Sequence, residues 1–231
     1  MMKPLMKLNR YAIIVAGGSG NRMGLSVPKQ FLPLCGVPVL IHTLKVFSSL
    51  SQKPSIYLVL PISEHNAWKD LCKKHSFNVP HTLVAGGETR FHSVKNGLDS
   101  IEGDGLVAIH DGVRPLVTQE LVEKCYLMAQ NAGNAVPAVN PFESIRVGKV
   151  NHNRKENRDL IWLVQTPQVF SVSQAQEFYK VEWNQEYTDD SSVAEANGII
   201  INLLEGSRDN IKITTPIDLK IAEAILESRK K

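Results

Sequence analysis

Short, continuous apolar runs alternate with longer amphipathic stretches along almost the whole chain, and this alternation restricts the fold more than any other feature. The apolar runs predict strands at 11–16, 55–61, 82–87, 105–111, 135–139 and 198–206. The stretches between them predict helices at 38–50, 64–75, 90–101, 118–132, 173–182 and 216–229. Strands that are apolar at successive positions are covered on both faces, and strands that alternate with helices are joined by parallel crossovers. The pattern therefore predicts an α/β fold of three layers.

The length of the chain fits one domain with an appendage. Because 231 residues with 43% hydrophobic content can bury one core, we expect residues 1–231 to form a single domain with a Rossmann-like, mostly parallel sheet. The last helix has a clear start, with Thr215 as N-cap, Pro216 in the first position and Asp218 in the first turn. Residues 140–161 break the alternation and predict a β-arm that protrudes from the sheet, with an exposed loop as the alternative.

The composition argues against several classes of protein. The three cysteines, Cys35, Cys72 and Cys125, form no C-x-x-C pair, so we expect neither disulfides nor a zinc site, and a reducing cytoplasm as the location. No apolar stretch approaches the roughly 20 residues that span a bilayer, so no membrane association is expected. The net charge of +3 and the aromatic content of 6% give no reason to expect a nucleic acid partner.

The distribution of charge is more informative than its sum. The first acidic residue is Glu64, and every charged residue before it is a lysine or an arginine. This positive quarter of the chain also contains a glycine-rich loop after the first predicted strand, in "AIIVAGGSGNRMGLSVPKQF" at residues 12–31. The combination predicts that a small anionic ligand binds there.

The spacing of the glycines separates this loop from two common phosphate-binding loops. Gly18, Gly20 and Gly24 give G-x-G-x-x-x-G, whereas a dinucleotide site requires G-x-G-x-x-G and an acidic residue about 20 positions further on. A Walker loop requires Gly-Lys-Ser/Thr, but Gly24 is followed by Leu25 and Ser26. Neither type of site is therefore expected.

Two cations distinguish the loop that remains. Arg22 lies within it and Lys29 follows seven residues later. Glycines allow backbone N–H groups to approach phosphate oxygens, and two cations can neutralise the charge that develops on a phosphorus centre and on a leaving pyrophosphate. The loop favours nucleotidyl transfer over the alternative, a strand-to-helix turn with two surface cations.

Two aspartates are candidates for a metal site. Asp111 ends a predicted strand, at the edge where open α/β sheets bind ligands. A carboxylate beside phosphates requires an intervening cation, and magnesium typically takes one or two carboxylates together with phosphate oxygens. Asp209, ahead of the run "IKITT", is the second candidate. For both residues the alternative is a role in a turn or a cap.

A series of motifs resembles one enzyme family. "AGGSGNRMG…PKQF" resembles the signature of the nucleotidyltransferases that activate sugars and polyols, in the form typical of their cytidylyltransferase branch. The further matches, in chain order, are "AGGETRFHSV", "HDGVRP", "QTPQVF", "TDDSSVAEANG" and "DNIKITTP". Within the branch, the chain is most similar to enzymes that act on 2-C-methyl-D-erythritol 4-phosphate. The resemblance implies transfer of CMP from CTP to that phosphate with release of pyrophosphate, in isoprenoid precursor biosynthesis. Alternatives are a ribitol 5-phosphate cytidylyltransferase and a nucleotide-binding regulatory module without turnover.

The resemblance also implies roles for individual residues. The predicted CTP-binding residues are Ala16, Gly17, Gly18, Gly20, Gly87, Glu88 and Ser93; the predicted catalytic residues are Arg22, Lys29, Arg158 and Lys212. The predicted polyol phosphate site contains Arg114, Ser144, Arg158 and Lys212, and Asp111 and Asp209 would bind Mg²⁺ or another divalent cation. Glu88 and Ser144 stand where many relatives have aspartate and threonine. Relatives form homodimers in which the arm completes the neighbouring site, which implies exchange of arms here. From the sequence alone, Arg158 also fits a solvated charge in a polar run.

Overall fold

A mixed β-sheet forms the centre of the protein. The computed structural model describes residues 8–17 and 27–229, and in this part of the chain the sheet has eight strands in the order β10-β7-β11-β6-β1-β4-β5, with β12 paired to β7. The strands are β1 (Arg10–Val15), β4 (Ser55–Leu60), β5 (Thr82–Ala85), β6 (Leu106–Asp111), β7 (Asn134–Val139), β10 (Leu163–Val164), β11 (Gln168–Ser171) and β12 (Leu203–Glu205). The β6-β1-β4-β5 part is parallel, and β11 runs antiparallel to both β6 and β7.

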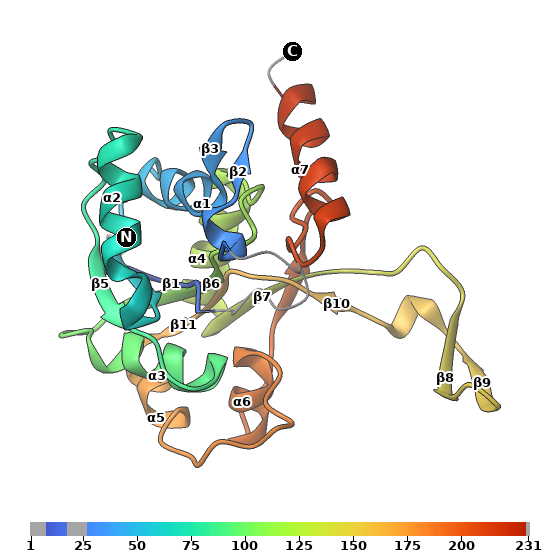
Figure 1. Cartoon of the computed structure of the whole chain (residues 1–231). Helices are drawn as coiled ribbons and strands as arrows, with labels where there is room; N and C mark the ends of the chain where they lie inside the picture. Colours follow the sequence, from blue (N-terminus) through green and yellow to red (C-terminus); the bar gives the residue numbers. More distant parts are fainter. Residues whose placement is uncertain (1–7, 18–26, 230–231) are drawn as a thin grey trace, which may run out of the picture.

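Helices cover both faces of this sheet (Figure 1). They are α1 (Val39–Ser48), α2 (His65–Lys74), α3 (Arg90–Asp99), α4 (Gln119–Ala132), α5 (Val172–Phe178), α6 (Asp190–Ala196) and α7 (Pro216–Ser228). Side chains of α1, α2 and α4 pack with one set of strand residues, and those of α3, α5 and α6 pack with the other set. The three expected layers are therefore present.

The continuous apolar runs account for these layers. In β1, Ile13 and Ile14 are both fully buried, Ile14 in the core under α1 and α4 and Ile13 in the core under α3 and α5. Val107 and Ala108 of β6 divide in the same way. Because successive side chains of a strand point to opposite faces, a strand with helices on both sides must be apolar at successive positions.

Several parts of the sequence prediction differ from the structure, and α6 and β10 were not among the predicted elements. The strand expected at 198–206 is reduced to Leu203–Glu205, which pairs with β7, and Ile200 before it is 84% exposed rather than packed between layers. The helix expected at 173–182 ends at Phe178. The antiparallel strand β11 was not predicted, since its short run "QVFS" lacks the length and the following crossover that mark the other strands.

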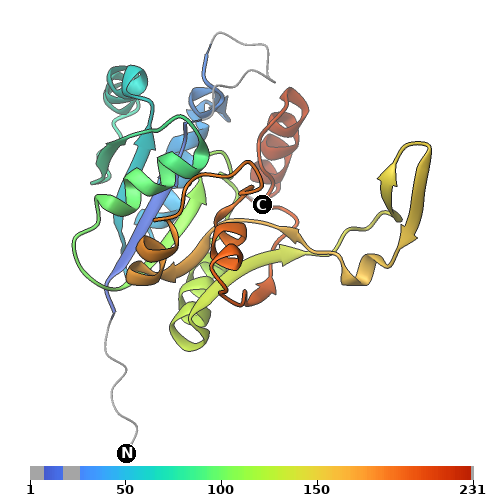
Figure 2. The same ribbon diagram turned by 90° about the horizontal axis from the view of Figure 1, so that it is seen from below.

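The predicted arm is a protruding hairpin. Its two strands, β8 (Ile145–Lys149) and β9 (His152–Glu156), pair only with each other and extend away from the body of the protein in two perpendicular views (Figures 1 and 2). A short 3-10 helix, η4 (Arg158–Leu160), leads the chain back to β10. Most residues of 140–161 are polar, which agrees with the lack of packing against the body of the protein, although Val147 and Val150 are exposed on the hairpin.

The C-terminal helix fixes the segment that precedes it. As predicted, α7 begins after Thr215, with Pro216 in its first turn, and the Asp218 carboxylate accepts hydrogen bonds from the backbone N–H groups of Thr214 and Thr215 at 2.8 and 2.7 Å. Ile213 and Ala222 are fully buried in a third apolar cluster, beside the loop after β6. In the part of the chain that the structure describes, no helix is long and apolar enough to cross a membrane.

Candidate functional site

The candidate site lies at one edge of the sheet. The parallel strands β1, β4, β5 and β6 all end there, and the antiparallel strand β11 begins there, since Gln168 pairs with Ile109. The segments that follow or precede these strand ends therefore meet, although they are far apart in the sequence. This is the edge at which open α/β sheets bind ligands.

A first cavity of about 400 Å³ opens between the end of β1 and the start of α3. Three of its lining residues, Lys29, Arg90 and Lys212, are cationic, and two, Glu88 and Asp111, are acidic. The lining residues are Val15, Ala16, Gly17, Lys29, Gln30, Gly87, Glu88, Thr89, Arg90, Ser93, Asp111, Val113 and Lys212. Lys29 comes from the short 3-10 helix η2 (Lys29–Phe31) and is only 9% exposed. A small anionic ligand suits such a cavity.

The start of α3 shapes one wall of the first cavity. Thr89 caps the helix by accepting a hydrogen bond from the backbone N–H of His92. Ser93 Oγ lies 3.1 Å from the backbone nitrogen of Gly87, which donates to it. A side chain at Gly87 would collide with His92, so glycine is required for the chain to pass this close to the helix. The motif "GGETRFHS" is thus a tight turn into a capped helix.

A second cavity, of about 430 Å³, lies on the other side of Asp111. It is lined by residues from β6, from the turn before β11 and from the start of α6, namely Arg90, Asp111, Arg114, Val164, Gln165, Thr166, Gln168, Thr188, Asp189, Ser191, Ser192, Glu195 and Lys212. Arg90, Asp111 and Lys212 line both cavities and form a wall that the two share. Ligands in the two cavities would meet at this shared wall.

Asp111 is the centre of the shared wall. Its Oδ1 accepts a hydrogen bond from Arg90 Nε at 3.2 Å, and its Oδ2 lies 2.8 Å from Lys212 Nζ and 3.5 Å from Arg114 Nε. Burial alone would raise the pKa of this carboxyl, but the three positive charges outweigh burial and hold its pKa well below the usual range. Asp111 is therefore ionised at neutral pH.

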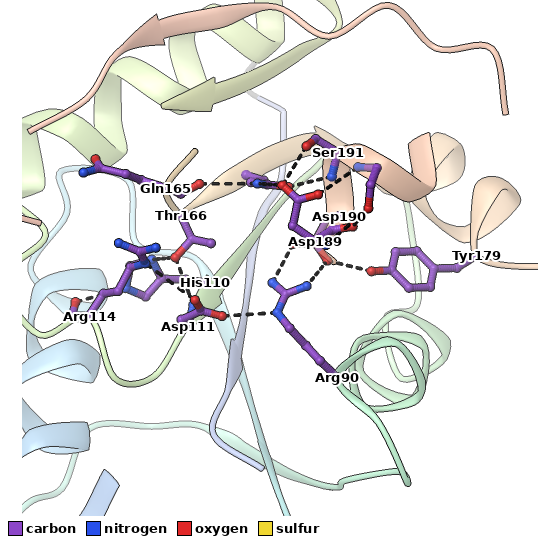
Figure 3. A network of polar contacts seen from close by, with 12 residues as sticks. Arg90, His110, Asp111, Arg114, Gln165, Thr166, Tyr179, Asp189, Asp190 and Ser191 are labelled. Carbon is purple, nitrogen blue, oxygen red and sulfur yellow. Dashed lines mark hydrogen bonds and ion pairs between the residues drawn. The ribbon is translucent and has the colours of Figure 1, made fainter. Parts of the chain in front are cut away.

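A buried network holds Arg90 in place (Figure 3). Its guanidinium donates two hydrogen bonds to the Asp190 carboxylate, at 2.9 and 2.7 Å, in the planar arrangement that arginine and carboxylate favour. The Tyr179 hydroxyl donates a further bond to Asp190 Oδ1 at 2.6 Å. Asp190 has no exposed surface, so its charge depends on these partners. The network fixes the arginine that in turn orients Asp111.

The neighbouring carboxylate, Asp189, orders the start of α6. It accepts hydrogen bonds from Gln168 Nε2 and Ser191 Oγ, both at 2.7 Å, and from the backbone N–H of Ser192. Burial raises the pKa of this carboxyl, but the hydrogen bonds outweigh burial and lower it. Asp189 therefore adds a stable negative charge to the second cavity.

His110 lies fully buried behind Asp111. Burial lowers the pKa of its imidazole to about 4, so the ring is neutral at neutral pH. Its Nδ1 lies 3.0 Å from Thr166 Oγ1 and its Nε2 lies 3.2 Å from the Arg114 carbonyl oxygen. Thr166 Oγ1 also accepts a hydrogen bond from the backbone N–H of Asp111. The ring therefore ties the turn before β11 to the end of β6.

The structure brings together most of the site residues predicted from the sequence. The first cavity contains Ala16, Gly17, Lys29, Gly87, Glu88, Ser93, Asp111 and Lys212, and the second contains Arg114 with Asp111 and Lys212. Arg22, Gly18 and Gly20 lie outside the described residues. Ser144 and Arg158 lie on the arm, where they line a separate hollow, and Arg158 Nη1 donates to the Phe142 carbonyl oxygen.

Asp209 is placed apart from the shared wall. Its carboxylate pairs with Arg229 at 3.1 Å, and neither cavity has it in its lining. Within residues 8–17 and 27–229, no three His, Cys, Asp or Glu side chains converge in a way that would hold a metal ion by themselves. The donor set at the shared wall, one ionised carboxylate beside a cavity for anions, nevertheless fits a magnesium ion that takes its other ligands from phosphates and water. Asp111 is the residue that fits this role.

Sequence reasoning missed several residues of the site. Arg90, Thr166, Asp189, Asp190 and Ser191 were contained in the motifs "GGETRFHSV", "QTPQVF" and "TDDSSVAEANG", but no role was predicted for them. The one local signal was Asp189, which is followed three residues later by Ser192 and caps α6. The partnership of Arg90 with Asp190 joins residues 100 positions apart, and no local pattern predicts such a pair.

Comparisons with known proteins agree on one family. The family profile of 2-C-methyl-D-erythritol 4-phosphate cytidylyltransferase matches residues 11–228. A protein of that name from Phocaeicola vulgatus is 48% identical over 219 residues, covering 95% of this chain and 100% of the relative. One from Bacteroides fragilis is 48% identical over 217 residues, covering 94% of this chain and 99% of the relative.

Solved structures of similar proteins have the same fold. The crystal structure of 4-diphosphocytidyl-2C-methyl-D-erythritol synthase from Anaerococcus prevotii superposes with a TM-score of 0.82 at 27% identity, covering 95% of this chain and 96% of that one. The crystal structure of 2-C-methyl-D-erythritol 4-phosphate cytidylyltransferase from Thermus thermophilus gives a TM-score of 0.77 at 28% identity, covering 95% of this chain and 100% of that one.

Proposed function

The chain belongs to the 2-C-methyl-D-erythritol 4-phosphate cytidylyltransferase family, and from this premise we propose how its two cavities perform the reaction. The protein is a nucleotidyltransferase that transfers CMP from CTP to the phosphate of 2-C-methyl-D-erythritol 4-phosphate. The products are 4-(CDP)-2-C-methyl-D-erythritol and pyrophosphate. CTP occupies the first cavity and the polyol phosphate occupies the second.

The observation that carries this assignment is the wall shared by the two cavities. Arg90, Asp111 and Lys212 line both of them, so a phosphate in one cavity approaches a phosphate in the other at these side chains. In-line transfer between two phosphorylated ligands requires this kind of meeting point. The attacking phosphomonoester is already anionic at neutral pH, so no general base is needed, and the main obstacle is the repulsion between like charges.

Cations of this chain reduce that repulsion. Lys29 in the first cavity and Arg22 in the preceding loop would stabilise charge on the α-phosphorus centre and on the leaving pyrophosphate. Lys212, on the shared wall, would orient the attacking phosphate, with Arg114 beside it in the second cavity. The hydroxyl of Ser93 and the close approach of the backbone at Gly87 suit the nucleoside, together with Ala16, Gly17 and Glu88.

We propose that a divalent cation, Mg²⁺, binds beside the CTP phosphates. Bound there, it would neutralise phosphate charge and polarise the α-phosphate. Asp111 would hold it, which would require its oxygens to exchange cationic partners. Asp209 remains a predicted second ligand, and it could serve only after its carboxylate leaves Arg229.

The protruding arm supports the prediction of a homodimer. A hairpin that pairs only with itself and carries exposed Val147 and Val150, the latter 93% exposed, offers apolar surface to a second copy. We propose that the arm delivers Arg158 and Ser144 to the polyol phosphate site of the neighbouring subunit. The predicted cytoplasmic location and the single domain over residues 1–231 also remain proposals.

Two alternative functions have less support. The family profile and the curated relatives carry the methylerythritol name, which favours this acceptor over ribitol 5-phosphate. A regulatory module without turnover would have no need of two cavities joined at one buried carboxylate with three cationic partners.

Pyrophosphate release tests the proposal. The protein is incubated with Mg²⁺ and CTP, and either 2-C-methyl-D-erythritol 4-phosphate or ribitol 5-phosphate is added, with ATP, GTP and UTP as matched replacements for CTP. We expect release only with CTP and the methylerythritol phosphate. Release with ribitol 5-phosphate alone, or CTP binding by calorimetry without release under any condition, would overturn the assignment.

A further inference from the structure

Four residues behind the shared wall form a closed ring of hydrogen bonds. Thr166 Oγ1 lies 3.0 Å from His110 Nδ1, and His110 Nε2 lies 3.2 Å from the Arg114 carbonyl oxygen. Arg114 Nη1 donates to the Asn210 carbonyl oxygen at 2.7 Å, and Asn210 Nδ2 donates to the Thr166 carbonyl oxygen at 2.8 Å. Figure 3 shows His110, Arg114 and Thr166 gathered beside Asp111.

The donor and acceptor groups of the four residues determine the direction of each hydrogen bond in the ring. A carbonyl oxygen can only accept, so His110 Nε2 carries the hydrogen that is donated to Arg114. The Nδ1 atom of the neutral imidazole then accepts, and the Thr166 hydroxyl must donate to it. Each residue of the ring therefore donates to the next, and a change at one position leaves a buried partner unsatisfied.

The ring joins three segments that the sheet does not hold together. The pairing of β11 with β6 begins at Gln168, so Thr166 lies beyond the ladder, and Arg114 lies beyond the end of β6. Asn210 belongs to the irregular segment that carries Lys212, and Ile213 attaches that segment to Val113 by a backbone bond. The ring therefore sets the positions of Arg114, Thr166 and Lys212 relative to one another.

We propose that His110 and Asn210 are positioning residues for the second cavity, acting through this ring on Arg114, Thr166 and Lys212. Both residues are completely buried and neither lines a cavity, so their effect must pass through the groups that do. This inference rests on the proposed function, in which the second cavity binds the polyol phosphate. Among the described residues, Gly87 and Ser93 on the far wall of the first cavity are bonded to each other and not to the ring.

Substitutions at His110 test the proposal. His110→Phe keeps an aromatic ring against Phe47 and removes both hydrogen bonds. We expect the KM for the polyol phosphate to rise about tenfold or more, with the KM for CTP within about twofold, because Arg114 and Thr166 line the second cavity alone and only Lys212 is shared with the first. His110→Gln retains a donor toward Arg114 and His110→Asn retains an acceptor for Thr166, so both should recover part of the loss.

Matched controls separate positioning from stability. His81 also uses both ring nitrogens, toward Trp68 and the Val79 carbonyl oxygen, but lies away from both cavities. Asn210→Ala is compared with Asn134→Ala, since Asn134 is also buried and bridges Ile200 and Asn202. We expect His81→Phe and Asn134→Ala to lower the melting temperature and leave both KM values within about twofold.

The outcomes distinguish this inference from the proposed function. If the wild-type protein releases no pyrophosphate from CTP and the polyol phosphate, the proposed function fails. If the wild type is active, the inference is overturned when His110→Phe and Asn210→Ala leave the acceptor KM unchanged. It is also overturned when both KM values rise alike, or when the two conservative variants at His110 recover nothing.

Discussion

At the scale of single residues, the site depends on charges that burial would disfavour if they were alone. Asp111 and Asp190 are both buried, and the single guanidinium of Arg90 donates hydrogen bonds to both carboxylates. Removing one partner of such a group leaves an uncompensated buried charge, which costs more than the contact itself contributes. The pairing of these residues therefore serves the geometry of the site more than the net stability of the protein.

Lys29 provides a test at this scale. Lys29→Ala should reduce kcat by about 100- to 1,000-fold and change the KM for CTP only a few-fold, because the lysine charge matters most when charge develops in the transition state. Steady-state pyrophosphate release measures both parameters. The control is Lys45→Ala, which removes an exposed lysine of α1 outside both cavities and should leave them unchanged. A normal kcat in Lys29→Ala would remove this residue from the mechanism.

At the scale of elements, the strand ends and helix starts decide where functional groups lie. Thr89 caps α3, Asp189 caps α6 and Asp218 fixes the start of α7, so side chains that belong to helix caps also frame the two cavities or the segment that carries Lys212. The same local interactions that start a helix thereby position the site.

The start of α7 gives a pH-dependent prediction. Burial raises the pKa of Asp218, but hydrogen bonds from Thr214 and Thr215 outweigh burial and lower it from the ordinary value of 3.8. Its stabilising effect is therefore complete above about pH 3.8 and is lost as the pH falls through the lower pKa of the folded state. Asp218→Asn should lower the free energy of unfolding by about 0.5 to 1 kcal/mol at pH 7.

Urea unfolding at pH 7 and near pH 3 measures this effect. The difference between wild type and Asp218→Asn should shrink at the lower pH, because the carboxyl becomes protonated and loses its advantage over an amide. Glu227→Gln, an exposed change in the last turn of the same helix, should have little effect at either pH. A difference that stays constant or grows as the pH falls would contradict the assigned role of Asp218.

At the scale of the whole molecule, the arm decides whether one chain is sufficient for activity. If each arm completes the neighbouring site, Lys29→Ala and Arg158→Ala each inactivate the homodimer, but a mixed dimer contains one site with both residues intact. Equal mixing with subunit exchange should therefore restore about a quarter of the sites, since half of the dimers are mixed and each has one intact site.

Pyrophosphate release from the mixed sample, with sedimentation to confirm the dimer, makes the comparison. Mixing Lys29→Ala with the double variant Lys29→Ala/Arg158→Ala is the control and should restore nothing, because no intact site can form. Absence of recovery in the first mixture, in a protein shown to exchange subunits, would mean that each arm serves its own chain.

The sequence by itself determined the features that depend on short stretches. Continuous apolar runs determined a sheet covered on both faces, and Thr215 with Pro216 determined the start of α7. Asp111 was selected because it ends a predicted strand and Lys29 because it follows the glycine-rich loop, whereas the family resemblance added Gly87 and Ser93. Local patterns suffice where the physical cause is itself local, as in caps, turns and periodic burial.

Only the tertiary structure decided which of these residues act together. Arg90 reaches Asp190 across 100 positions, and the ring through Thr166 and Asn210 closes only because β11 enters the sheet antiparallel beside β6. In the folded chain, Asp209 forms an ion pair with Arg229. It therefore lies apart from Asp111, although both had been predicted to bind the same metal ion. Charge pairs and hydrogen bonds between distant segments depend on the packing of the whole chain, so no spacing within the sequence specifies them.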